Sequence, residues 1–278
     1  MSQAEPCPMP GLIYGTAWKK ERTAELVTQA LRLGFRGIDT ACQPKHYHEA
    51  GVGEALQILA QEGLARHEIY VQTKFTPLNG QDPLRLPYNP EASLTEQVQQ
   101  SFQVSLANLK TDYLDALVLH SPYPRWGELY EVWTSMEELY HAGKVKRLGI
   151  SNCYDLPVLR DLCEKAAVPP SIVQNRLYAE TGFDHALRLW CKKVGIAYQS
   201  FWTLTANPEI LRSPHLQNMA AAYERTPEQI FFRALIQLGL TPLTGTCQEQ
   251  HMREDLAVLE WELPEAAVSQ IKGMITPV

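Results

Sequence analysis

The sequence lacks the glycine-rich loops that bind nucleotide phosphates in many α/β proteins. Neither GxGxxG nor GxxxxGKS/T occurs in its 278 residues, which argues against an open dinucleotide-binding sheet and a P-loop fold. No stretch approaches the roughly 18 uninterrupted apolar residues that a membrane helix needs. Residues 1–10 are polar and proline-rich, without the basic start and apolar run of a signal peptide. These absences favour a cytoplasmic protein with no membrane partner.

Cysteine pairs and an excess of positive charge are also missing. The net charge is −6, whereas a surface that binds nucleic-acid phosphates needs a surplus of lysine and arginine. The six cysteines form no CxxC pair, which is typical of reduced thiols in a cytosolic protein. They are Cys7, Cys42, Cys153, Cys163, Cys191 and Cys247.

Short apolar runs alternate with helical patterns along the whole sequence. The runs are rich in Val, Ile and Leu, as expected of parallel strands buried on both faces. Eight strands, each followed by a helix and with no low-complexity linker, predict an α/β fold, a (β/α)8 TIM barrel. We expect one domain over residues 1–278. The predicted strands cover residues 11–17, 35–40, 69–75, 116–120, 146–151, 172–177, 196–201 and 240–244.

The predicted helices carry apolar residues at helical spacing. One of them opens at Thr226, where a capping hydroxyl precedes Pro227 and Glu228. The longest irregular stretch, residues 76–90, follows the third strand and is expected at the catalytic mouth. The other helices cover residues 21–33, 51–62, 93–109, 127–141, 156–166, 183–194, 249–259 and 264–274.

Polar side chains gather at the C-terminal ends of the predicted strands, where barrel enzymes carry their chemistry. Asp39, Lys74 and His120 stand at the ends of strands two, three and four. An acid beside the lysine would pair the two charges and so permit their burial. Either these residues form a structural ion pair and a core histidine, or the three belong to one catalytic site.

Several motifs, in order, resemble the aldo/keto reductase superfamily. The resemblance spans nearly the whole chain. It implies a barrel oxidoreductase that reduces aldehydes or ketones to alcohols with a nicotinamide cofactor. The similar segments are residues 34–41 and 52–56 around a catalytic aspartate, 72–75 around a lysine, 112–122 on a histidine strand, 143–145 and 149–152 at the cofactor amides, and 9–10 and 15–18 at the start.

The resemblance implies four catalytic residues, Asp39, Tyr47, Lys74 and His120. A tyrosine is the general acid, and His120 orients the substrate oxygen. The unperturbed phenol pKa is near 10. An ammonium at Lys74, held by Asp39, is expected to lower it.

The tyrosine departs from the commonest pattern of the family. It usually stands five residues after the aspartate, a position occupied by Pro44. Tyr47 lies close to its expected distance from Val52 and is therefore assigned as the acid. His46 or His48 could share this role, or could be solvent-facing or capping residues.

The resemblance also implies a nicotinamide site. Side-chain amides suit the carboxamide because they both donate and accept hydrogen bonds, and Phe201 stands where an aromatic ring stacks on the nicotinamide. The expected cofactor-binding residues are Gly15, Thr16, Ala17, Asp39, Ser151, Asn152, Gln174, Phe201, Trp202, Leu204, Thr244, Gly245 and Thr246.

The residues expected at the adenosine end of the cofactor differ from the family pattern. The usual Pro-Lys-Ser reads Pro242-Leu243-Thr244, so the lysine is absent. The later arginine is not at its usual spacing, where Glu249 stands, and Arg253 lies further on. The resemblance implies NADP, as NADPH. The two lost cations weaken the charge-assisted contacts that favour it, so NAD is the alternative.

The substrate and the assembly state are less defined by the sequence. The loop over residues 121–127 is short, so we expect an open mouth for a small carbonyl compound. Candidate apolar walls are Trp18, Tyr88, Tyr123 and Trp126, each of which could instead be simple packing. We expect a monomer or a weak homo-oligomer.

Two competing functions use other chemistry. A cofactor-binding sensor or regulatory subunit with little turnover could share the fold, because fold does not determine function. A metal-dependent hydrolase is disfavoured because no HxH or carboxylate-rich cluster directly follows a predicted strand. We expect no metal.

Overall fold

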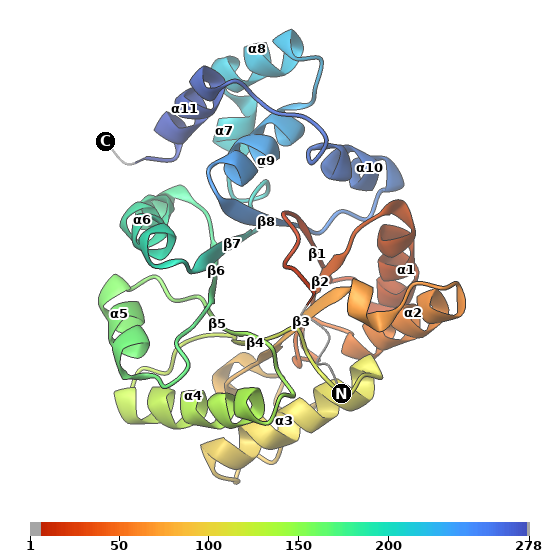
Figure 1. Cartoon of the computed structure of the whole chain (residues 1–278), viewed down its shortest axis with the longest axis vertical. Coiled ribbons are helices and arrows are strands. Elements are labelled where there is room, and N and C mark those ends of the chain that lie inside the picture. The colour runs from red at the N-terminus through yellow and green to blue at the C-terminus, as the bar shows by residue number, and fades with distance from the viewer. Residues whose placement is uncertain (1–6, 277–278) are drawn as a thin grey trace.

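The computed structural model describes residues 7–276 and shows a closed barrel of eight parallel strands in chain order (Figure 1). The predicted (β/α)8 barrel is confirmed, and each observed strand lies within its predicted run. The expectations for residues 1–10 and for one domain over 1–278 extend outside the described residues and stay predictions. The strands are β1 (Ile13–Gly15), β2 (Gly37–Asp39), β3 (Tyr70–Phe75), β4 (Ala116–Leu119), β5 (Leu148–Ser151), β6 (Ile172–Arg176), β7 (Ala197–Phe201) and β8 (Leu240–Thr244).

Helices surround the barrel as an outer ring (Figure 1). The predicted opening at Thr226 is confirmed, since its hydroxyl accepts from the Gln229 N–H while the Gln229 side chain accepts from the Thr226 N–H. The predicted helices are α1 (Thr23–Leu33), α2 (Glu49–Gln61), α3 (Leu94–Leu109), α4 (Trp126–His141), α5 (Leu156–Lys165), α6 (His185–Val194), α9 (Pro227–Gln237), α10 (Glu249–Ala257) and α11 (Glu265–Met274).

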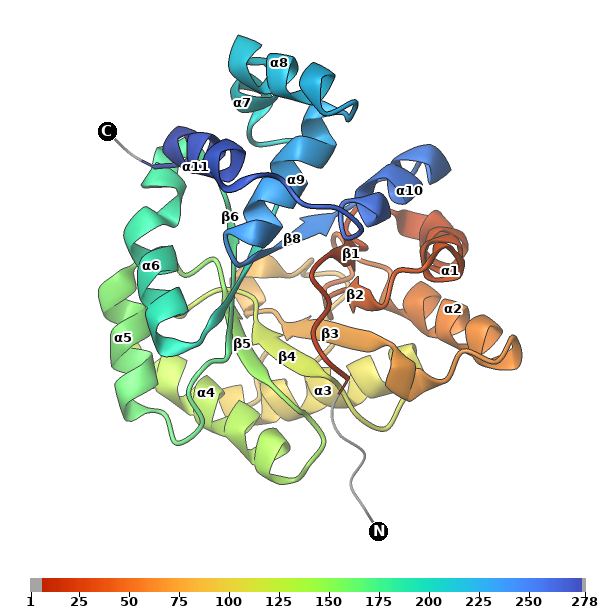
Figure 2. The same cartoon turned by 45° about the horizontal axis from the view of Figure 1, so that its top comes forward.

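Two further helices, α7 (Pro208–Arg212) and α8 (Pro214–Ala222), were not predicted. They fill the segment between β7 and α9 and lie beyond the outer end of α9 (Figure 2). Helix α7 is too short for a periodic pattern to reveal it. Helix α8 begins with a usable signal, because the Ser213 hydroxyl caps the Leu216 N–H and Pro214 follows.

The barrel interior contains a layer of polar side chains, where many barrels hold branched apolar ones. Gln72 of β3 and Gln199 of β7 exchange two hydrogen bonds of 2.8 and 2.9 Å between their amides. Gln174 of β6 donates to the Gln199 oxygen at 2.8 Å, and the Tyr70 hydroxyl donates to Gln72 at 3.0 Å. These buried groups are paired with one another, which offsets the cost of removing them from water.

Helix α2 approaches α3 closely at a glycine. A Cβ added at Gly53 would lie 2.0 Å from the backbone oxygen of Asn108. No side chain fits at that separation, so the glycine sets the distance between the two helices. Helix α2 follows directly after the segment that carries Tyr47, and its packing therefore anchors one wall of the barrel mouth.

We expect Gly53→Ala to destabilise the fold by about 1–3 kcal/mol or more through this clash. Gly273→Ala is the matched control on α11, since nothing lies within 4 Å of its added Cβ. That change should be neutral or stabilise the fold by up to about 1 kcal/mol through helix propensity. Urea unfolding measures both free energies. An unchanged midpoint in Gly53→Ala would contradict the close approach.

Candidate active site

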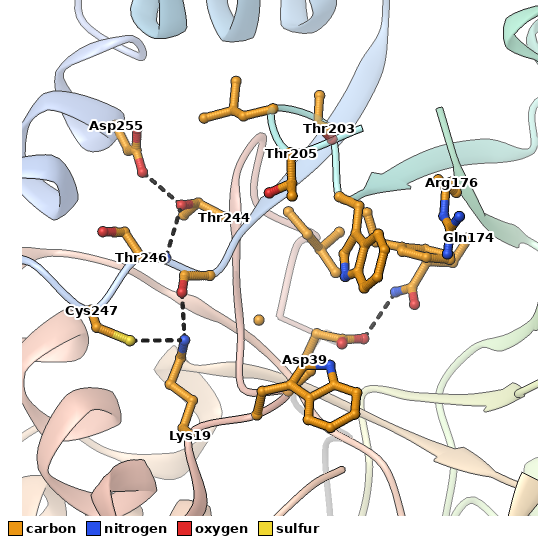
Figure 3. Close-up of a pocket in the computed structure, with 18 of the residues that line it drawn as sticks. Lys19, Asp39, Gln174, Arg176, Thr203, Thr205, Thr244, Thr246, Cys247 and Asp255 are labelled. Carbon is orange, nitrogen blue, oxygen red and sulfur yellow. Dashed lines mark hydrogen bonds between the residues drawn. The ribbon is translucent and has the colours of Figure 1, made fainter. Parts of the chain in front are cut away.

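A cavity of about 1010 Å³ opens at the C-terminal ends of the strands (Figure 3). This volume is at the upper end of what small-molecule sites usually reach. Its wall is built from residues at the ends of seven of the eight strands or in the segments that follow them, with none from β3. The lining residues include Gly15, Ala17, Trp18, Lys19, Asp39, His46, Tyr47, His120, Ser151, Asn152, Gln174, Arg176, Phe201, Trp202, Leu204, Glu228, Leu243, Thr244, Gly245, Thr246, Cys247, His251, Glu254 and Asp255.

A buried ion pair lies at the base of this cavity. Lys74 Nζ is 2.6 and 2.7 Å from the two Asp39 oxygens and donates to the Thr40 carbonyl at 2.9 Å. The three ammonium hydrogens therefore match three acceptors. Gln72 and Gln174 donate to Asp39 Oδ1 at 2.7 and 2.9 Å. Burial lowers the pKa of Lys74, and the Asp39 carboxylate opposes that effect.

Tyr47 lies directly above this pair. Its ring centroid is 5.2 Å from Lys74 Nζ and 6.0 Å from the ring centroid of His120. The structure thus brings together all four residues that the sequence assigned to catalysis.

The pKa of Tyr47 moves in the direction opposite to the expectation. Burial raises it, and the nearby Asp39 carboxylate adds to the effect. The physical reason is that Asp39 neutralises Lys74, so the phenol faces a pair with little net charge and the loss of solvation dominates. The phenol of Tyr47 therefore holds its proton more tightly than a free tyrosine does.

His120 is a neutral imidazole in this environment. Burial lowers its pKa well below the usual value, and the positive charge of Lys74 lowers it further. Its Nδ1 lies 2.7 Å from the hydroxyl of Thr76, which follows β3. This contact fixes the orientation of the ring, because only the other nitrogen is left to face the cavity.

The two neighbouring histidines occupy different surroundings. His46 lines the cavity and packs on the indole of Trp18, with ring centroids 3.9 Å apart. Its Nδ1 is buried and has no hydrogen-bond partner among residues 7–276. His48 is exposed and precedes α2, where its side chain makes no capping hydrogen bond.

The expected carboxamide ligands lie together beside the ion pair. Asn152 Nδ2 donates to the His120 carbonyl at 2.8 Å, and the Ser151 hydroxyl donates to the Gln174 carbonyl at 2.7 Å. Gln174 uses its NH2 group on Asp39 and Gln199, and its oxygen accepts no hydrogen bond from the described residues. That oxygen remains available for an amide donor.

Most of the other expected cofactor residues also line the cavity. These are Gly15, Ala17, Phe201, Trp202, Leu204, Thr244, Gly245 and Thr246. Thr16 does not line it. Its side chain is buried, and its hydroxyl donates to the Asp39 carbonyl at 2.9 Å, so it supports the strand pair instead.

Of the four expected apolar walls, only Trp18 lines the cavity. Tyr88 is buried on Phe75 and donates its hydroxyl to the Thr76 carbonyl at 2.7 Å. Trp126 stacks with Tyr130 on the outer helix layer. Tyr123 is half-buried, and its hydroxyl is buried without a partner among residues 7–276.

The sequence reasoning missed two cations in the cavity wall. Lys19 is only 6% exposed and donates to the Gly245 carbonyl at 2.5 Å, with Cys247 Sγ at 3.6 Å (Figure 3). Arg176 packs its guanidinium on the Trp202 ring at 4.3 Å, and its Nε is buried without a partner. Neither makes an ion pair with any described residue. The signal available in the sequence was their position, which is in the loop after β1 for Lys19 and at the end of β6 for Arg176.

These residues fit a nicotinamide dinucleotide. The cavity is large, it holds a free amide acceptor at one end, and it contains two cations without carboxylate partners. A buried charge of this kind calls for an anionic ligand group. Lys19 and Arg176 would meet the diphosphate, and Ser151, Asn152 and Gln174 the carboxamide.

Comparison with known proteins supports the family resemblance that the sequence motifs indicated. The family model described as "Aldo/keto reductase family" matches residues 12–206. No helix within residues 7–276 is long and apolar enough to cross a membrane.

Two curated relatives and one solved structure illustrate the similarity. The chain is 25% identical over 250 residues to glyoxal reductase of Bacillus subtilis (strain 168), which covers 90% of this chain and 82% of that protein. It is 29% identical over 274 residues to 2,5-diketo-D-gluconic acid reductase B of Corynebacterium sp. (strain SHS752001), covering 99% and 91%.

The crystal structure of MGS-M4, an aldo-keto reductase enzyme from a Medee basin deep-sea metagenome library, superposes with a TM-score of 0.81. The two chains are 26% identical, and the match covers 97% of this chain and 92% of that one. The family model alone spans well over half of the sequence. The chain therefore belongs to the aldo/keto reductase family and is an oxidoreductase.

Proposed function

We propose that this enzyme reduces the carbonyl group of small aldehydes or ketones to an alcohol, using NADH or NADPH. The observation that carries the proposal is the position of the Tyr47 phenol, which packs against both the Lys74 ammonium and the His120 ring in the cavity wall. The relatives are named for reduction of glyoxal and of a diketo sugar acid, which supports a carbonyl substrate.

In this proposal Tyr47 gives its proton to the carbonyl oxygen. A bound nicotinamide would supply the hydride that the carbonyl carbon takes up. The raised pKa keeps the phenol protonated before the reaction. The oxygen that develops alkoxide character is a far stronger base than a phenolate, so proton transfer from Tyr47 is downhill.

His120 orients the substrate oxygen as a neutral hydrogen-bond donor. When the Thr76 hydroxyl donates to Nδ1 across the 2.7 Å contact, the ring hydrogen sits on Nε2 and is available to that oxygen. Thr76 is thus a positioning residue that selects the tautomer. His120 and Tyr47 would then hold the same oxygen from two sides.

The substrate should be small and should not require a deep apolar pocket. Trp18 is 57% exposed at the mouth and packs on His46, while Tyr88, Tyr123 and Trp126 lie outside the cavity wall. Among these four aromatic residues, only Trp18 thus contributes a wall at the mouth. These positions favour short carbonyl compounds whose polar groups remain hydrated.

Tyr47→Phe should lower the turnover of an activated aldehyde by at least about 100-fold, because it removes the proton donor. Binding of the reduced cofactor, measured by fluorescence titration, should be unchanged. Tyr140→Phe is the matched control, since Tyr140 is an exposed tyrosine on α4. Retained activity in Tyr47→Phe would overturn the assignment, and loss of activity in His46→Phe would then move it to His46.

Thr76→Val should lower kcat by about tenfold, the worth of one well-placed hydrogen bond, while Thr76→Ser keeps the hydroxyl and should restore kcat. The melting temperature of the valine variant should stay close to that of the wild type. A purely structural role for Thr76 would change stability without this recovery by serine. Equal kcat in both variants would remove Thr76 from the proposal.

Single-turnover experiments separate the enzyme from a cofactor-binding sensor. Purified protein loaded with reduced cofactor and mixed with an activated aldehyde should oxidise one equivalent of cofactor. Tight cofactor binding with no oxidation by any activated carbonyl would favour the sensor.

A further inference from the structure

The end of the cavity that lies between α9 and α10 carries three carboxylates, which we call the acidic cluster: Glu228, Glu254 and Asp255. Glu228 stands in the first turn of α9, and the other two project from α10. Asp255 is only 4% exposed, and the Thr244 hydroxyl donates to its Oδ2 at 2.7 Å (Figure 3).

The negative charges of Glu228 and Glu254 act on the carboxyl group of Asp255. The pKa of Asp255 is raised to about 6, chiefly by burial and in addition by the negative charges of Glu254 and Glu228, while His251 opposes these effects. A group bound at this end therefore meets a negative potential from two helices.

No arginine or lysine offsets this negative potential from the two positions where the family usually carries a cation. Leu243 occupies the position of the family's lysine in β8. Arg253 on α10 turns to the surface, where it is 63% exposed and pairs with Glu249 at 2.6 Å. The two cations that line the cavity are Lys19, bound at Gly245, and Arg176, stacked on a ring beside β7.

The cavity thus has an order of charge along its length. Amide side chains lie beside the ion pair, with Arg176 next to Gln174 (Figure 3), and Lys19 is a second cation without a carboxylate partner, in the loop after β1. The acidic cluster lies beyond it on α9 and α10. Lys19 calls for one anionic group, and carboxylates accept hydrogen bonds from hydroxyl groups. A further phosphate at the acidic cluster would face three carboxylates with no arginine or lysine of α10 in the cavity wall to balance them, and His251 is the one titratable group of α10 beside them that opposes their charge.

We propose that this enzyme binds NAD(H) in preference to NADP(H), with the diphosphate at Lys19 and the hydroxyl groups of the adenosine ribose at the acidic cluster. This inference rests on the proposed function, since it concerns the same cofactor. It replaces the expectation of NADP that the family resemblance implied. The preference follows from the charges of this chain, because a ribose hydroxyl donates to a carboxylate whereas a 2′-phosphate is repelled by it.

A metal ion is a poor alternative occupant of the acidic cluster. Within the part of the chain that the structure describes, no three His, Cys, Asp or Glu side chains are grouped so that they could hold a metal ion. The three carboxylates come from two helices, Glu228 from α9 and the other two from α10.

Fluorescence titration of the full-length protein with NADH and with NADPH tests the preference. We expect the Kd for NADH to be at least tenfold lower. In the double variant Glu228→Gln/Glu254→Gln the Kd for NADPH should fall at least tenfold, while that for NADH changes less than threefold. Glu249→Gln on the same helix is the matched control, because Glu249 is exposed and does not line the cavity. Its two Kd values should match those of the wild type.

The outcomes distinguish this inference from the proposed function. Tighter binding of NADPH than of NADH by the wild type would overturn the preference and leave carbonyl reduction intact. A selective loss of NADPH binding in Lys19→Met would also overturn it, because Lys19 would then serve the 2′-phosphate. Binding of neither dinucleotide would overturn both the preference and the proposed function.

Discussion

The ion pair between Asp39 and Lys74 is the constraint on which the mouth of the barrel depends. Burying either charge alone would cost on the order of several kcal/mol. The pair is tolerable because each ammonium hydrogen has an acceptor, and because the amides of Gln72 on β3 and Gln174 on β6 donate to the carboxylate. Barrel closure brings these strands together. The same closure delivers Tyr47 and His120 to the pair, so the fold and the reacting end are stabilised by one set of contacts.

Different parts of the cavity wall carry different charges. Beside the ion pair, burial favours the neutral forms of both Tyr47 and His120. Positive charge comes from Lys19 in the loop after β1 and from Arg176 at the end of β6. Negative charge comes from α9 and α10, the helices before and after β8 in the chain. A ligand that spans the cavity therefore meets charges of both signs.

Much of the fold and of the reacting end could be predicted from the sequence. Apolar strand runs and the polar residues at their C-terminal ends are local patterns, and they identified the barrel, Asp39, Lys74 and His120. Contacts between distant segments leave no such pattern. Lys19 faces Gly245 only because β1 and β8 pair. The direction of the Tyr47 pKa could not be predicted either, because it depends on how completely a neighbouring charge is neutralised.

The polar layer inside the barrel couples positions that lie far apart in the chain. Gln72 and Gln174 each donate to both Asp39 and Gln199, and Gln199 also donates to the sulfur of Met9 at 3.2 Å. Changing any one of these side chains leaves a partner buried and unsatisfied. A substitution at one of these positions is therefore expected to require compensating substitutions at the others, because each side chain satisfies more than one buried partner.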